Sequence, residues 1–410
     1  MVAAMNSALL VDWLAAAGLR NLPLEEMVDG FSRGLNDAGV PVARVFVGMN
    51  TLHPLVRARS LIWDRITGPS THFEFQHSQI ESTVWRQSPF VPMLRDGIFE
   101  RRVRVDDPRA AAETPVFQEL YDAGMTDWLG SIFPFGELTL QIGGADTAEP
   151  ASELGFVVSL ATDRADGFAE AHVETLRAML PLFALAVKAT TIGALGQGLL
   201  AAYLGDDPAR RVLAGSVRRG EVESVEAVLL YADLRSFTPF ADSLPGAELM
   251  TLLDGCFDCM VRPVNRHGGE VLKFLGDGLL AIFRTGKRRR AEICAAALAA
   301  ASEALDLMDI LAAARREQAR ETPGLDIALH VGTVQYGNVG TDTRLDFTVI
   351  GPAVNEAARI EMLCKELGQS LLMSEAFASA AASSRPHLVS LGRHRLRGVR
   401  DDTELFGLAS

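Results

Sequence analysis

The feature that most constrains the fold of this chain is a pair of apolar runs joined by Gly276-Asp277-Gly278. The runs Val271–Leu275 and Leu279–Phe283 have the length and composition of strands. A connection this short and this rich in Gly and Asp predicts a tight hairpin with Asp277 at its tip. A third apolar run, Ala227–Ala232, predicts a buried strand that ends directly before Asp233.

Helices and strands alternate around this hairpin. Apolar spacing predicts helices over Gly246–His267, Lys287–Arg320 and Pro352–Leu367. It predicts further strands over Leu325–Gly332 and Leu345–Ile350. The resulting order, βαββαβ and onward, predicts an α+β sandwich with helices packed on a mostly antiparallel sheet.

The first half of the chain has a mixed α/β pattern. Strands are predicted over Val42–Val47, Leu61–Ile66, Thr71–Gln76, Trp128–Pro134, Leu138–Ile142 and Gly155–Leu160, and helices over Leu22–Leu35, over Pro115–Ala123 and from Gly167 toward Leu204. The segment Gly205–Gly220 is polar and rich in charge, as linkers are. We therefore predict a first domain over residues 1–192, a helical linker over 193–220 and a second domain over 221–410.

Charge and cysteine content exclude several classes of protein. The net charge of −13 excludes sequence-independent nucleic-acid binding, which needs a basic surface, and disfavours an anionic membrane as partner. The most apolar stretch, Ala178–Ala189, is shorter than the ~20 residues that a bilayer requires. Four cysteines form no disulfide framework, so a cytoplasmic protein is expected. Cys256 and Cys259 are spaced as metal ligands can be, but we interpret them as helix residues.

Two aspartates are candidates for a metal site. Asp233 follows a buried strand, and Asp277 stands on a hairpin that the topology can bring beside that strand. Two neighbouring carboxylates repel each other unless a divalent cation joins them. Ligation by oxygen alone favours Mg²⁺ or Mn²⁺ over zinc. The alternative is that Asp277 is an ordinary surface residue of a Gly-Asp-Gly turn.

Three further polar residues stand where they could bind a ligand. Lys273 interrupts an apolar strand, so it either faces solvent or donates to a ligand. Asn355 and Arg359 are four residues apart on a predicted helix and share one face. A guanidinium binds phosphate in a bidentate manner, and an amide can bind a hydroxyl. The alternative is an exposed polar face in which Glu356 and Glu361 are the partners.

Three motifs together resemble the class III nucleotidyl cyclase catalytic domain. They are Asp233-Leu234-Arg235-Ser236-Phe237-Thr238, Phe274-Leu275-Gly276-Asp277-Gly278, and the segment from Asp346 to Arg359 that contains Gly351-Pro352-Ala353-Val354-Asn355. The resemblance covers residues 221–408 and includes the order and spacing of the motifs. It implies a ferredoxin-like βαββαβ core.

The resemblance also implies a role for each residue. Asp233, Asp277 and the Leu234 carbonyl match the ligands of two divalent cations, Mg²⁺ or Mn²⁺. Lys273 and Thr348 match the two residues that read the base, in a Lys/Thr combination found in a bacterial subgroup. Asn355 and Arg359 match the pair that orients the ribose and stabilises the transition state. Phe237, Thr238 and Arg397 match residues on the substrate, although many members have Lys in place of Arg397.

These assignments lead to an expected activity. Lysine donates to a ring nitrogen of adenine and a threonine hydroxyl accepts from the adenine amine, so ATP is the expected substrate and cyclic AMP the product. Because the family builds each site from two domains arranged head to tail, and this chain carries both sets of residues, a homodimer is expected. The alternatives are a guanylate cyclase and a catalytically inactive nucleotide-sensing module.

The first half of the chain resembles, more distantly, a GAF-type sensor domain. The resemblance rests on the order of its predicted elements and on Ala161-Thr162-Asp163, which precedes Gly167-Phe168 and a long helix. It implies that a small molecule or another signal acts at this domain and reaches the cyclase domain through the segment 168–220.

Overall fold

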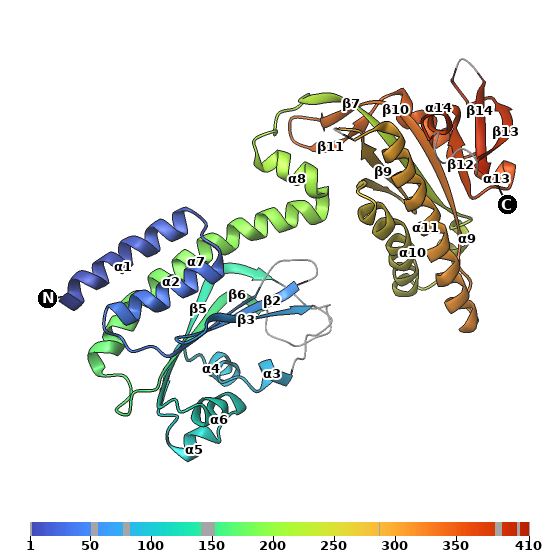
Figure 1. Ribbon diagram of the computed structural model, residues 1–410. Helices are drawn as coiled ribbons and strands as arrows, with labels where there is room; N and C mark the ends of the chain where they lie inside the picture. The colour runs from blue at the N-terminus through green and yellow to red at the C-terminus, as the bar shows by residue number, and fades with distance from the viewer. Residues whose placement is uncertain are drawn as a thin grey trace. The chain divides into compact units, whose positions relative to one another are not determined.

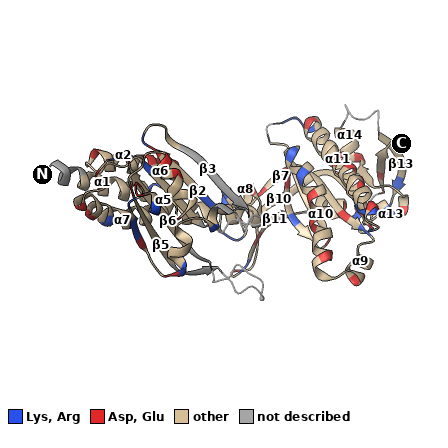
Figure 2. Cartoon of the chain, turned by 90° about the horizontal axis from the view of Figure 1, so that it is seen from below, with Lys and Arg blue, Asp and Glu red and all other residues tan. Residues whose placement is uncertain are grey.

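The computed structural model describes residues 2–50, 56–76, 83–140, 152–286, 288–381, 388–399 and 402–409. The chain divides into two compact units, Met1–Leu199 and Leu200–Ser410. Each has its own sheet and core (Figure 1). Acidic and basic residues are interspersed over the helices of both units (Figure 2).

The first unit is built on a six-stranded antiparallel sheet in the order β3-β2-β1-β6-β5-β4. Its strands are β1 (Arg44–Asn50), β2 (Val56–Asp64), β3 (Gly68–Gln76), β4 (Glu100–Val103), β5 (Asp127–Leu140) and β6 (Ser152–Thr162). Its helices are α1 (Val2–Leu19), α2 (Leu24–Asp37), α3 (Thr83–Arg86), α4 (Phe90–Arg95), α5 (Pro108–Ala111), α6 (Pro115–Asp122) and α7 (Glu170–Leu204). Helices α1, α2 and α7 cover one face, and α4 and α6 pack on the other (Figure 1).

This unit corrects one sequence prediction and leaves another open. The two strands predicted before and after Phe135 are a single strand, β5, because a register shift after Pro134 lets the ladder with β6 continue. The end of the second predicted strand, at residues 141 and 142, lies outside the described residues. The predicted helix toward Leu204 is one continuous helix, α7, in spite of Pro181. The likeness to a GAF-type sensor stays a prediction.

Helix α7 is the one described helix that is long and apolar enough to cross a membrane by length and composition. The apolar stretch predicted from the sequence, Ala178–Ala189, is only part of this helix. One third, 33%, of its most apolar 18-residue window is buried inside the protein. Its buried residues, Val173, Leu176, Leu180, Phe183 and Val187 among them, pack on the sheet of the first unit.

The second unit is built on a larger sheet in the order β13-β14-β12-β10-β7-β9-β8, with β11 also paired to β10. Its strands are β7 (Val222–Arg235), β8 (Glu270–Leu275), β9 (Gly278–Arg284), β10 (Gly324–Gly340), β11 (Leu345–Ile350), β12 (Leu371–Ser374), β13 (Leu388–His394) and β14 (Thr403–Leu408). Only the β10–β12 pair is parallel among the pairings described, which confirms the mostly antiparallel α+β sandwich.

Helices cover both faces of this sheet. They are α8 (Asp206–Leu213), α9 (Thr238–Ser243), α10 (Gly246–Arg266), α11 (Arg290–Glu317), α12 (Pro352–Glu361), α13 (Cys364–Leu367) and α14 (Glu375–Ala380). Residues of β7 alternate between the two cores: Val228 and Leu230 pack under α10 and α11, whereas Leu229 packs on the α12 side. The single helix predicted over Pro352–Leu367 is two helices, α12 and α13. Cys256 and Cys259 are free residues of α10, as predicted.

Helix α8 is anchored to this sheet through Asp207. The Asp207 carboxylate accepts hydrogen bonds from the Tyr336 hydroxyl (2.9 Å) and from Arg211 Nε (2.7 Å), and it forms an ion pair with Arg284 (3.0 Å). The Asp207 amide donates to Glu270 Oε1 (3.0 Å). Although burial acts in the opposite direction, hydrogen bonds from Arg284 and Tyr336 hold the pKa of Asp207 below its usual value. Helix α8 is thus tied to β8, β9 and β10.

Candidate active site

The fold brings Asp233 and the turn that carries Asp277 together. Strand β9 pairs with β7, and Leu279 lies opposite Ala232 in the ladder. Gly278 lies so close to β7 that an added Cβ would stand 2.6 Å from Asp233 Oδ1 and 2.5 Å from the Ala232 carbonyl oxygen. The absence of a side chain at Gly278 therefore lets the hairpin approach the Asp233 carboxylate.

The charge state of Asp233 reflects this crowding. Burial raises its pKa to about 6, and the neighbouring Asp277 charge acts in the same direction. The Leu234 amide donates to the Asp233 carboxylate and partly opposes the rise. Two carboxylates that repel each other at one place are an oxygen donor set suited to a divalent cation such as Mg²⁺ or Mn²⁺. Among the described residues, no group of three or more His, Cys, Asp and Glu is arranged to hold a metal, so backbone oxygens such as that of Leu234 would have to complete the set.

Phe237 and Thr238 lie on the turn that leads from β7 into α9. Ser236, just before them, has a positive φ of 61°, which reverses the chain direction at the end of the strand. Phe237 is partly buried and lies parallel to Phe240, with ring centroids 6.5 Å apart. Thr238 is exposed at the first position of α9. Both residues are therefore positioned by the same turn that follows Asp233.

Lys273 and Thr348 lie on one polar face. Lys273 of β8 forms an ion pair with Asp346 of β11, across 73 positions of sequence. Asp346 and Thr348 are two residues apart on a strand, so their side chains point to the same face, opposite the buried Phe347 and Val349. The contact between Asp346 and Lys273 is not predicted from the sequence. The signal for it is that Asp346 stands two residues before Thr348 on the same predicted strand, which places both side chains on one face.

Asn355 and Arg359 lie one turn apart on α12, as predicted. Asn355 is exposed and Arg359 is partly exposed. The Arg359 guanidinium lies against Gly398, where an added Cβ would stand 3.4 Å from one of its terminal nitrogens. Arg397 precedes Gly398 in the same turn and is exposed. In the alternative of an exposed polar face, Glu361 does not fit, because it is only 9% exposed. Glu356 is partly exposed, and the Arg359 charge opposes the rise that burial causes in its pKa.

Glu361 belongs to an acidic region around Asp233 instead. Burial raises the pKa of Glu361 to about 7, and Asp233, Asp326 and Asp277 add to the rise. Asp326 lies opposite Asp233 in the β7–β10 ladder and is paired with Arg235, whose Nε donates to it over 3.0 Å. Sequence reasoning missed Glu361 because the amphipathic pattern of α12 does not reveal which acid points toward the sheet.

The site residues fall into two groups by charge. The acidic half is Asp233 with Asp277 and Asp326, both of which raise its pKa. The basic half contains Arg359, which lies against Gly398.

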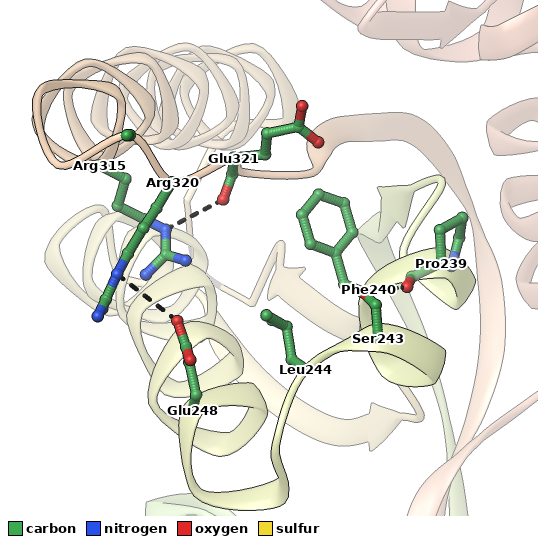
Figure 3. A pocket seen from close by; sticks show the side chains of 9 residues that line it. Pro239, Phe240, Ser243, Leu244, Glu248, Arg315, Arg320 and Glu321 are labelled. Carbon is green, nitrogen blue, oxygen red and sulfur yellow. Dashed lines mark hydrogen bonds and ion pairs between the residues drawn. The ribbon is translucent and has the colours of Figure 1, made fainter.

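A pocket of about 370 Å³ lies elsewhere, between α9, α10 and the end of α11 (Figure 3). Phe240 and Leu244 form its apolar wall. Its polar groups bind one another: Arg315 Nε donates to the Glu321 carbonyl over 3.2 Å, and Arg320 pairs with Glu248 at 3.6 Å. None of the predicted site residues lines this pocket.

Comparison with known proteins identifies the second unit. The family model described as "Adenylate and Guanylate cyclase catalytic domain" matches residues 221–410. An adenylate cyclase of Anabaena cylindrica is 31% identical over 164 residues, which are 39% of this chain and 32% of that protein. An uncharacterised protein of Mycobacterium tuberculosis is 35% identical over 187 residues, 45% of this chain and 31% of that protein. The chain thus spans about a third of the length of these relatives.

Among solved structures, the adenylyl cyclase CyaB from P. aeruginosa aligns with a TM-score of 0.42 and 22% identity, over 46% of this chain and 96% of that chain. The guanylyl cyclase Cya2 aligns with a TM-score of 0.41 and 23% identity, over 46% and 94%. The family match itself covers the strands, turns and helix that hold all the predicted site residues. Residues 221–410 are an adenylate and guanylate cyclase catalytic domain.

Proposed function

We propose that this protein is an adenylate cyclase that converts ATP to 3′,5′-cyclic AMP and pyrophosphate. The observation that carries the proposal is the approach of Asp277 to Asp233 within a domain of this family. The domains of this family use divalent metal ions, and the oxygen donors at this place fit them. Mg²⁺ or Mn²⁺ held by Asp233, Asp277 and the Leu234 carbonyl would lower the pKa of the ribose 3′-hydroxyl and offset charge on the leaving pyrophosphate.

The reaction itself requires positioning more than covalent chemistry. The 3′-oxygen of ATP forms a bond to the α-phosphorus, the bond from that phosphorus to the β-phosphate oxygen breaks, and the hydroxyl proton passes to solvent. Asn355 would orient the ribose through its amide. Arg359 would place positive charge on the α-phosphoryl oxygens, where negative charge develops, and Arg397 would supply a second cation to the phosphates. Phe237 and Thr238 would contact the phosphates from the turn after β7.

Lys273 and Thr348 support adenine as the base. A lysine donates to a ring nitrogen of adenine, and the threonine hydroxyl accepts from its amine. A guanine site needs an acceptor for the guanine N–H groups, and Asp346, the acid nearest to Lys273, already binds that lysine. A guanylate cyclase remains the second candidate because Asp346 could serve as that acceptor if it released Lys273. An inactive module is less well supported, since every motif residue is present.

The family match supports a homodimer, since the domains of this family act as dimers. In a head-to-tail pair, Asp233 and Asp277 of one chain would face Arg359 of the other, giving two equivalent sites. The first unit would then regulate the pair in response to a small molecule or another signal. Any change in the first unit that shifts the two halves by ~1 Å would alter the rate on the order of a hundredfold.

The decisive experiment offers purified full-length protein ATP or GTP with Mg²⁺ or Mn²⁺ and identifies the cyclic nucleotide formed. Cyclic AMP is expected, and it should vanish in Asp277→Ala. Asp254→Ala, which removes an exposed carboxylate of α10, is the matched control and should keep its activity. Faster formation of cyclic GMP would replace the proposal with the guanylate cyclase, and no product from either nucleotide with both metals would contradict both.

A further inference from the structure

The face of β10 that lies under α12 carries one buried histidine, His330, which is only 6% exposed. On one side of it, Gly332 lies so close to α12 that an added Cβ would stand 2.5 Å from the Cβ of Ala353. On the other side, Ala328 packs in a small core with Ile360 of α12. A polar ring held between two apolar contacts needs hydrogen-bonding partners of its own.

The neighbours of the His330 ring fix where its proton lies. The Ser374 hydroxyl oxygen is 2.9 Å from Nδ1, and it accepts a hydrogen bond from the Phe377 amide over 3.2 Å, so its own proton is available for Nδ1. On the opposite side of the ring, Nε2 lies 3.5 Å from a carboxylate oxygen of Glu356. Burial lowers the pKa of His330 to about 4, so the ring is neutral and carries one proton. Because a bare Nε2 would repel the carboxylate, that proton lies on Nε2 and faces Glu356.

Glu356 stands between this ring and Arg359. Glu356 and Arg359 are three positions apart on α12, a spacing at which a glutamate and an arginine commonly pair on a helix. Burial raises the pKa of Glu356, and the Arg359 charge opposes that rise, so the two groups interact. In the described part of the chain, the Glu356 carboxylate nevertheless faces His330 and forms no ion pair with Arg359.

An ion pair between Glu356 and Arg359 would weaken the proposed reaction. Arg359 stabilises charge on the phosphoryl oxygens only if its N–H groups and its charge are available to them. A carboxylate that binds a guanidinium occupies two of those N–H groups and cancels the charge. Since the Glu356 side chain is partly exposed, a change of its rotamer is enough to form that pair once nothing holds it at β10.

We infer that His330 is a positioning residue of the cyclase reaction: its Nε2–H holds the Glu356 carboxylate at β10 and so keeps Arg359 unpaired for the substrate. The inference rests on the proposed function, which assigns Arg359 to the α-phosphoryl group. His330 acts only through Glu356, because it is buried beneath α12.

Steady-state kinetics of cyclic nucleotide formation by the purified full-length protein tests the inference. His330→Leu removes the N–H that holds Glu356, so kcat should fall at least about tenfold. KM should stay within about twofold of the wild-type value, because the lost interaction belongs to the transition state. His330→Gln, whose amide can donate from the place of Nε2, should keep kcat within about threefold of wild type. An unchanged kcat for His330→Leu, or equal losses for both variants, would overturn the inference.

A second substitution separates positioning from a purely structural role. If the released carboxylate is what impairs Arg359, Glu356→Gln added to His330→Leu should raise kcat at least about fivefold above that of His330→Leu alone. A double variant no more active than His330→Leu would show that His330 serves packing only. His267→Leu is the matched control, because Nε2 of His267 also faces a carboxylate, that of Glu303 at 2.9 Å, but in the layer of α10 and α11. Its kcat should equal that of the wild type.

A crystal structure of His330→Leu gives a readout that needs no activity. The Glu356 carboxylate should move from β10 to within ion-pair distance of Arg359, and a carboxylate that stays in place would contradict the inference. Wild-type protein that forms no cyclic nucleotide would refute the proposed cyclase instead, and the crystal structure would still decide whether His330 restrains Glu356.

Discussion

At the scale of single residues, the pair of Lys273 and Asp346 is open to a direct test. Asp346→Asn removes the charge that holds the lysine, so the KM for ATP should rise about two- to fivefold, the range expected for an exposed ion pair, with little change in kcat. Steady-state kinetics with ATP and GTP measures both constants. Asp342→Asn, an exposed acid of the loop before β11, is the control. An effect on kcat alone would place Asp346 in the chemical step instead.

The buried His330 gives the stability of the protein a pH dependence. Burial lowers its pKa to about 4, so His330 is neutral in the folded protein at pH 5 to 6, while the unfolded chain binds a proton below pH ~6.5. The contribution of His330 to the free energy of unfolding is therefore complete above pH 6.5. It falls by roughly 3 kcal/mol as the pH drops from 6.5 toward 4. Two groups face the ring: Ser374 Oγ, 2.9 Å from Nδ1, and Glu356, 3.5 Å from Nε2.

His330→Gln keeps a partner for Ser374 and removes the titration. Denaturant unfolding at pH 7 and pH 4.5 should show a smaller loss of unfolding free energy on acidification in this variant than in the wild type. Equal losses in the two proteins would mean that other groups cause the acid sensitivity.

At the scale of secondary-structure elements, the approach of the β8–β9 hairpin to β7 depends on Gly278. Gly278→Ala would place a methyl group against the Asp233 carboxylate and the Ala232 carbonyl, and the hairpin would have to move. A shift of ~1 Å is expected to reduce the cyclase rate at least about a hundredfold while the fold persists. Gly246→Ala, where an added Cβ meets nothing within 4 Å, should be active. Circular dichroism of both variants separates lost activity from lost structure.

The same hairpin illustrates how much of the fold the sequence predicts. The apolar runs around Asp277 are sufficient to predict β8, β9 and their turn, because hairpin pairing is local. The ends of long strands were not predictable in this way. β10 continues from the predicted end at Gly332 to Gly340, since its pairing with β7 and β11 compensates for polar and Gly residues that usually end a strand. Contacts such as Lys273 with Asp346 join distant segments and leave only a weak local signal.

At the scale of the whole molecule, the proposed division of the site between two chains predicts complementation. Asp277→Ala damages only the acidic half and Arg359→Ala only the basic half, so each protein alone should be inactive. A mixed dimer has one site with both halves intact. If subunits exchange and pair at random, an equal mixture should recover about a quarter of the wild-type rate of cyclic AMP formation. No recovery after exchange, confirmed by the appearance of mixed dimers, would indicate that each chain holds a complete site.

The contacts of Asp207 determine where a different sensor domain can be joined to this cyclase domain. Its partners Arg284 and Tyr336 come from strands of the cyclase unit, so α8 belongs structurally to that unit although it precedes residues 221–410 in the sequence. A chimaera in which another sensor is joined after Leu213 would leave Arg284 and Tyr336 without their acid. A junction between Leu199 and Gly205 keeps the contact, so chimaeras joined there should retain more cyclase activity than chimaeras joined after Leu213.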